Sequence, residues 1–220
     1  MRPAAADGAT WMLAQWTHTT KRIMLGASTL PMNDTALTAN QGSSADERMH
    51  RARRRYRRVM WLALALGTGC AVTLHIIDAP LRTPEAPYGI VSFELAWSSA
   101  GAGRMRDSWD DHARLHAAFG LGFDYLFLCA YGALAWSLLR LRALALACAQ
   151  RPRWARACAS LAPAAWAAAG CDALENAALW RVLADPAAPW PMLAAALATA
   201  KFMILAALIS VWLTTWTITR

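Results

Sequence analysis

Residues 119–139 read FGLGFDYLFLCAYGALAWSLL, an apolar run interrupted by a single charged residue, Asp124. The hydrocarbon core of a bilayer is about 30 Å thick, so a helix needs about 20 mainly apolar residues to cross it. A chain in lipid must also satisfy its backbone hydrogen bonds within the segment. The run is therefore predicted to be a transmembrane helix.

Three further segments have the same character. They are VMWLALALGTGCAVTLHIIDA at residues 59–79, an alanine-rich run at 157–183, and a fourth run at 191–215. Four such helices in a chain of 220 residues predict an all-α membrane protein, folded as a four-transmembrane-helix bundle over residues 59–220.

The overall composition agrees with this fold. The chain is 57% hydrophobic and 16% charged, with a mean hydropathy of +0.26, whereas soluble domains carry about 25% charged residues. Soluble enzymes, disordered chains, collagen-like rods and small disulfide-linked secreted domains are excluded. The five cysteines lie scattered in or beside the apolar runs, which is typical of small residues at helix interfaces.

Basic residues are unevenly divided between the two sides of the predicted bundle. Sixteen Lys and Arg fall before residue 59, in the 140–156 loop and at Arg220, whereas five fall in the loops of the opposite side. By the positive-inside rule, both termini and the 140–156 loop are predicted to be cytoplasmic. The Ala- and Arg-rich composition favours a bacterial inner membrane.

The chain before the first span divides into two parts. Residues 1–48 lack sustained periodicity and a signal-peptide core, and they are predicted to be a disordered tail. Starts at Met24, Met32 or Met49 would each leave the four spans intact, so the true start is left open. Residues 49–58 form a basic cytoplasmic anchor, which is typical of a topology signal; binding of anionic lipid or nucleic acid is the alternative.

The 80–118 segment between the first two spans begins with a proline-rich turn. Apolar residues then recur at helical spacing in IVSFELAW, residues 90–97, with Glu94 beside the apolar stripe. This pattern predicts a short helix at the outer membrane interface that ends at Gly101 and Gly103.

Ionisable side chains inside spans are costly and usually face the bundle interior. On the third helix Asp172, Glu175 and Asn176 lie within one arc of about 100°, and on the second Asp124 shares a face with Tyr131. At about 1.5 Å per residue, the ionisable groups fall in the outer half of the membrane, which predicts a polar funnel open to the outside. The candidate buried polar site comprises His75, Asp78, Glu94, Asp124, Tyr131, Asp172, Glu175, Asn176 and Lys201.

Charge balance limits the state of this site, because the carboxyls outnumber Lys201. Either some carboxyls are protonated, or His75 is charged, or a cation is bound. Three interpretations stay open: an ion pair that only fixes helix register, a proton-coupled or substrate-binding site, and a metal site of carboxylates with His75. No ligand spacing is diagnostic, so no metal and no cofactor is assigned.

The motifs YGIVSFELA (88–96), FDYLFLCAY (123–131) and CDALENAAL (171–179), together with the lysine of ATAKF (198–202), carry a family resemblance. In this pattern the chain resembles a family of uncharacterised bacterial integral-membrane proteins with four spans. The resemblance extends from about residue 59 to the end. It implies that the polar residues of these motifs are important to the protein, and it implies no particular activity.

Three functional classes are compatible with these features. The favoured one is proton- or cation-coupled binding or transport; the alternatives are an intramembrane enzyme acting on a lipid or small molecule, and a structural or accessory subunit. Four spans without an internal repeat are few for a stand-alone transporter, a shortfall that a homo-oligomer would repair. The expected partners are the lipid bilayer and further copies of the chain, not nucleic acid.

The predicted orientation is tested by cysteine labelling in a chain whose native cysteines are replaced. Single cysteines near Pro84 and Ala187 are expected to react with an impermeant thiol reagent added to intact cells, because both positions lie in outer loops. Cysteines in the 140–156 loop are expected to react only after permeabilisation. The reverse labelling pattern would invert the topology.

Overall fold

The computed structural model describes residues 34–217, with side chains from residue 46 onward. Most of the predicted tail lies outside the described residues, but helix α2 (Asp34–Ile77) begins within it. Arg and Ala, which are frequent just before the first span, are good helix formers and extend the helix. Contacts divide the chain into Met1–Arg48 and Met49–Arg220, and the second unit contains the bundle.

Within residues 34–217, four helical segments are long and apolar enough to cross a membrane, which confirms the predicted four-span fold. The segments run Asp46–Ile77, Asp111–Cys148, Pro152–Ala184 and Trp190–Thr217. The helices that follow α2 in these segments are α5 (Asp111–Cys148), α6 (Pro152–Leu161), α7 (Ala164–Ala184) and α8 (Trp190–Thr217).

The third span differs from its prediction, because the expected continuous helix over 157–183 is two helices, α6 and α7. Pro163 stands at the break, and it has no backbone N–H with which to continue the helical hydrogen-bond ladder. The short α6 packs Ala155 and Cys158 into one apolar cluster with Leu139 and Leu146 of α5, closing one end of the bundle.

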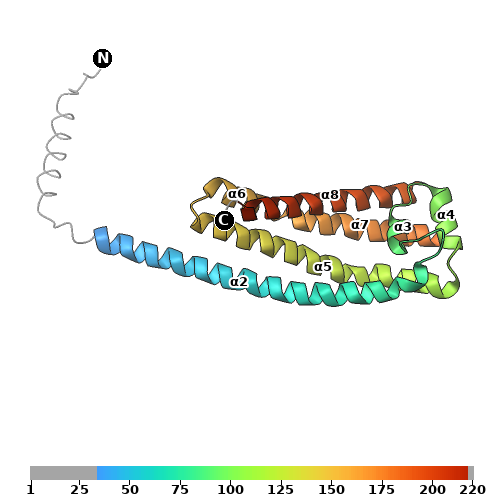
Figure 1. The fold of residues 1–220 in the computed structure, drawn as a ribbon, viewed down its shortest axis with the longest axis horizontal. Helices are drawn as coiled ribbons and strands as arrows, with labels where there is room; N and C mark the ends of the chain where they lie inside the picture. Colours follow the sequence, from blue (N-terminus) through green and yellow to red (C-terminus); the bar gives the residue numbers. More distant parts are fainter. Residues whose placement is uncertain (1–33, 218–220) are drawn as a thin grey trace, which may run out of the picture. The chain divides into compact units, whose positions relative to one another are not determined.

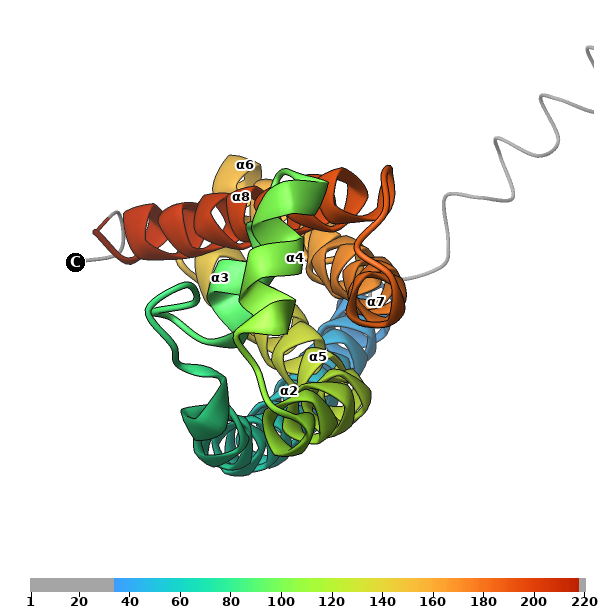
Figure 2. The same cartoon turned by 90° about the vertical axis from the view of Figure 1, so that its right-hand side faces the viewer.

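Within the unit from Met49 onward, α2, α5, α7 and α8 run alongside one another (Figure 1). The turn between α5 and α6 and the last residues of α8 lie at one end, whereas α3 and α4 lie across the other end (Figure 2). Helix α8 packs mainly on α7, and few of its residues contact α5. This uneven packing leaves space between α5 and α8.

The segment between the first two spans forms the 3₁₀ turn η1 (Ala79–Leu81) and two helices, α3 (Ile90–Glu94) and α4 (Ser99–Asp107). The predicted single helix ending at the glycines is wrong, because α3 stops at Glu94 and the glycines lie inside α4. A new helix starts there because the Ser98 hydroxyl accepts a hydrogen bond from Gly101 N at 3.1 Å.

The end that carries α3 and α4 has its own apolar core. Phe93 of α3 packs against Trp109 with 4.9 Å between ring centroids. Trp109 also donates its indole N–H to the Leu81 carbonyl at 2.8 Å. Both aromatic side chains are fully buried, and Leu179 and Val182 of α7 join the same cluster. The short helix α3 is therefore held in place although it is too short to be stable alone.

Asp78, at the end of the first span, fixes the start of α3. Its Oδ1 accepts a hydrogen bond from Ile90 N at 2.7 Å, and its Oδ2 accepts one from Arg82 Nε at 3.1 Å. Gly89 precedes Ile90 with φ +58°, and a Cβ atom there would lie 2.2 Å from Asp78 Oδ1. Only glycine fits this close approach and this conformation without strain.

The substitution Gly89→Ala is expected to destabilise the protein by about 1–3 kcal/mol, because it adds a left-handed backbone penalty and displaces the Asp78 carboxylate. The measurement is the thermal unfolding midpoint in detergent. Gly122→Ala on α5 is the control, since no atom lies within 4 Å of a Cβ there. Equal stability of the Gly89→Ala variant and the parent would contradict the assigned role of the Asp78–Ile90 hydrogen bond.

Candidate functional site

Lys201 lies in the middle of α8, in one of the most apolar segments of the chain, and only 6% of it is exposed. Its Nζ lies 2.6 Å from Asp172 Oδ1 and 2.8 Å from Glu175 Oε2. The two acidic residues are three positions apart on α7 and so share one face of that helix. An ammonium group buried in a membrane span requires such partners.

Glu94 approaches the same lysine from α3. Its Oε2 lies 3.7 Å from Lys201 Nζ, and its side chain is largely buried. Burial raises the pKa of Glu94 to about 7; the positive charge of Lys201 acts in the opposite direction but does not cancel this effect. Glu94 therefore changes its charge near neutral pH.

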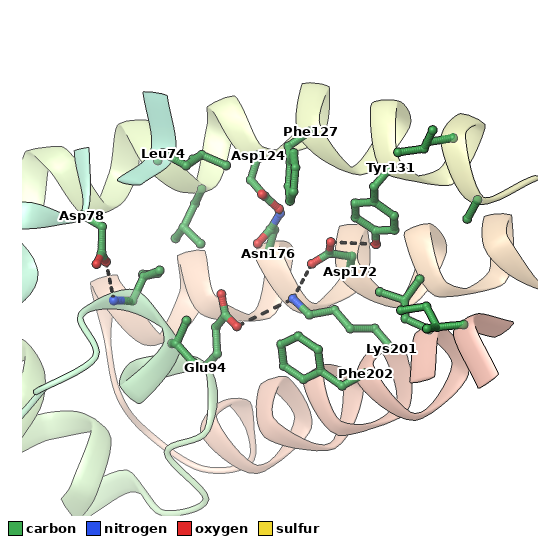
Figure 3. A pocket seen from close by; sticks show the side chains of 18 of the residues that line it. Leu74, Asp78, Glu94, Asp124, Phe127, Tyr131, Asp172, Asn176, Lys201 and Phe202 are labelled. Carbon is green, nitrogen blue, oxygen red and sulfur yellow. Dashed lines mark hydrogen bonds and ion pairs between the residues drawn. The ribbon is translucent and has the colours of Figure 1, made fainter. Parts of the chain in front are cut away.

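Helix α5 contributes two further polar side chains. Asn176 donates its side-chain N–H to Asp124 Oδ2 at 2.7 Å, and Tyr131 donates its hydroxyl hydrogen to Asp172 Oδ2 at 2.8 Å. Figure 3 shows these groups converging from α3, α5, α7 and α8. The set is called the Lys201 cluster below; it comprises Glu94, Asp124, Tyr131, Asp172, Glu175, Asn176 and Lys201.

The cluster holds four carboxyl groups and one ammonium group, so full ionisation would leave a net charge of three negative units. Glu175 is fully buried, and neither of its carboxylate oxygens has a hydrogen-bond donor among the described residues. The 2.8 Å contact with Lys201 is therefore an ion pair whose geometry does not make a hydrogen bond. Such an excess of buried acceptors favours protonation or an added cation.

A pocket of about 530 Å³ adjoins the cluster, between α5 and α8. Its polar lining includes Glu94, Asp124 and Lys201 (Figure 3). Beyond Tyr131 the pocket continues along apolar side chains; they include Leu134, Leu138, Leu205, Leu208, Ile209 and Trp212. The polar groups therefore line only one part of the pocket, and the lining beyond them is apolar.

The pocket is open at its side. Val91, Phe202 and Ile209 belong to its lining, and each of them is more than 40% exposed. Phe202 and Ile209 lie on α8, inside a segment that is long and apolar enough to cross a membrane. On a helix that crosses a membrane, exposed side chains such as these would face the hydrocarbon region.

Two predicted site residues lie apart from the cluster. His75 is exposed, and its Nδ1 lies 3.3 Å from Arg82 Nη2. Asp78 borders the pocket, but its two oxygens already accept hydrogen bonds from Ile90 and Arg82. Asp78 therefore serves the connection to α3, and it does not contact Lys201.

The sequence analysis missed the aromatic part of the site. Phe127 and Phe202 both line the pocket, and the Phe202 ring lies 5.0 Å from Lys201 Nζ. Phe127 packs edge-on against Tyr131, with 5.5 Å between ring centroids. Phe127 follows Asp124 at helical spacing and was recognisable from the pattern, whereas the position of Phe202 beside the lysine carried no such signal.

The metal interpretation finds little support in the geometry. Among residues 46–217, no three His, Cys, Asp or Glu side chains are grouped so that they could hold a metal ion. His75 does not contact the cluster, and the remaining carboxyls surround an ammonium group. The ammonium group of Lys201 therefore already supplies the positive charge that a metal ion would supply to these carboxylates.

Over residues 34–217 the structure thus shows a helical bundle with four segments long and apolar enough to cross a membrane, together with a polar cluster and a lateral pocket. The resemblance to four-span bacterial membrane proteins stays a prediction that rests on the motifs around Glu94, Asp124, Glu175 and Lys201. No protein-family model, curated protein or solved structure matches the chain.

Proposed function

We propose that this protein binds a small amphipathic or lipid-like molecule that enters from the bilayer, and that binding is coupled to a change in protonation of the Lys201 cluster. One observation carries the proposal: a lateral pocket of about 530 Å³ is lined by apolar side chains together with polar groups of the cluster. Its volume lies within the roughly 300–1,000 Å³ of ordinary ligand pockets. An apolar pocket with a polar section suits a molecule that has an apolar part and a polar part.

The coupling to protons rests on the charge excess. The cluster holds four carboxyls and one ammonium group, and burial raises the pKa of Glu94 to about 7. A ligand that changes the charge or the hydration beside Glu94 shifts that pKa, and by linkage a change in pH shifts the affinity for the ligand. This supports proton-coupled binding or transport as the function.

We also propose in which membrane the protein lies and on which side its termini are. The uneven distribution of basic residues favours cytoplasmic termini in a bacterial inner membrane. In that orientation α3 and α4 lie at the outer side, because they connect the first two spans. Glu94 then stands at the outer end of the pocket, and the apolar part of the pocket extends toward the cytoplasmic leaflet.

A structural role is the second candidate, and the short contacts of Lys201 favour it. Distances of 2.6 and 2.8 Å to two carboxylates are those of a well-formed ion pair that fixes the register of α7 and α8. Such a pair does not require Glu94, Asp124 or the pocket. An intramembrane enzyme is a weaker alternative, since none of the contacts around the cluster activates a nucleophile.

Ligand binding is tested with a photoreactive twelve-carbon alcohol added to the protein in nanodiscs. Saturable labelling of α5 and α8 is expected, and excess dodecanol should prevent it. Leu205→Trp fills the pocket and should reduce labelling tenfold or more. Leu213→Trp, at an exposed site on the same helix outside the pocket lining, should leave it unchanged. Labelling that does not saturate, or equal labelling of both variants, would refute the binding function.

Proton coupling is tested by the pH dependence of stability. Because the pKa of Glu94 rises from 4.5 to about 7 on folding, the folded state holds the proton more tightly, and stability falls as pH increases through this range. Glu94→Gln should remove about 1–3 kcal/mol of this pH-dependent loss between pH 5 and 8. Thermal unfolding in detergent measures the effect.

The exposed Glu85 provides the matched control for this experiment. Glu85→Gln removes the same group from the turn before α3 and should leave the pH profile of the parent. A Glu94→Gln variant that is destabilised equally at every pH would support the structural role, in which the carboxylate only pairs with Lys201.

A further inference from the structure

The ion pairs already present beside the pocket indicate which charge a ligand's headgroup can carry. Three carboxylates, those of Asp172, Glu175 and Glu94, already lie within 3.7 Å of Lys201 Nζ. An anionic headgroup would have to displace one of these carboxylates and face the others. The lysine therefore does not provide a site for a fatty acid or a phosphate.

Asp124 is in the opposite situation. It lines the pocket, and its only hydrogen-bond partner within the described part of the chain is the neutral amide of Asn176, at Oδ2. No cation lies within ion-pair distance of its carboxylate among these residues, because the ammonium of Lys201 is surrounded by the other three acids. Asp124 is thus a carboxylate at the pocket that still needs a positive partner.

Fully buried Glu175 adds an independent observation of the same kind. Both of its oxygens are without a hydrogen-bond donor although the side chain has no exposed surface. The cluster as a whole therefore has more buried negative charge and more acceptors than its own donors satisfy. A cationic donor that enters the pocket would reduce the excess negative charge and would offer a partner to Asp124, which lines the pocket.

Aromatic rings surround the same place. Phe127, Tyr131 and Phe202 all line the pocket near Asp124 and Lys201 (Figure 3). The faces of aromatic rings attract cations, and the attraction is larger where water is excluded. Beyond these rings the lining from Asp124 to Leu138 extends for roughly 21 Å of helix α5, which accommodates an alkyl chain.

We infer that the ligand is a cationic amphiphile, an alkyl chain with a protonated amine, whose ammonium group pairs with Asp124 among the three aromatic rings while its chain occupies the apolar length of the pocket. The inference rests on the proposed binding function and narrows its ligand class. It assigns Asp124 to headgroup selection and Lys201 to holding the remaining acids in place.

The test is competition against the photoreactive alcohol with three compounds of equal chain length: dodecylamine, dodecanol and dodecanoate. A hydrogen-bonded charge pair is worth about ten- to a hundredfold in affinity. Dodecylamine is therefore expected to compete at a concentration ten- to a hundredfold below that of dodecanol, and dodecanoate should be the weakest of the three. Equal competition by all three, or preference for dodecanoate, would overturn the inference while leaving the pocket function intact.

Asp124→Asn should abolish the preference for the amine and leave competition by dodecanol unchanged, because the amide keeps the size of the side chain and removes its charge. Asp111→Asn is the control, since Asp111 is a fully exposed acid on the same helix. Photolabelling by the alcohol itself shows whether each variant is folded. Methylamine, which has the charge but no chain, should not compete at the same concentrations; equal competition by methylamine would overturn the inference in favour of a simple cation site.

Discussion

The burial of one ammonium group constrains much of this structure. Lys201 sits inside an apolar helix, where an unpaired charge is costly, and its nearest partners come from α7 and α3. Two of them, Asp172 and Glu175, bring α7 against α8, and these two helices make the most extensive contact of the bundle. The third, Glu94, comes from a five-residue helix outside the spans. The position of that helix therefore determines whether Glu94 reaches Lys201.

The residues that position α3 lie outside the apolar spans and are connected by a series of contacts. Asp78 receives the first backbone N–H of α3, Gly89 permits the close approach, and Phe93 packs into the core with Trp109. Through Glu94 the segment that contains α3 and α4 is linked electrostatically to Lys201. Burial raises the pKa of Glu94 to about 7, and its carboxyl group lies where α3 meets the cluster.

The pocket results from the way in which the helices pack. Since α8 is held against α7, it makes few contacts with α5, and the space between them is lined by leucines below the cluster and by aromatic rings beside it. A purely structural ion pair would need no such space. The pocket combines surplus carboxylates, aromatic rings and an open apolar side. This combination supports binding of an amphipathic ligand over a purely structural role.

The sequence alone determined the features that depend on local physics. Apolar run length specified four spans, and helical periodicity placed Asp172, Glu175 and Asn176 on one face, because each depends only on neighbouring residues. The tertiary structure decided the features that depend on residues far apart in the chain. It separated His75 from the cluster, brought Glu94 to 3.7 Å from Lys201 and broke the third span at Pro163. It also set Phe202 beside the lysine and left the pocket open, because these outcomes follow from how helices pack against one another.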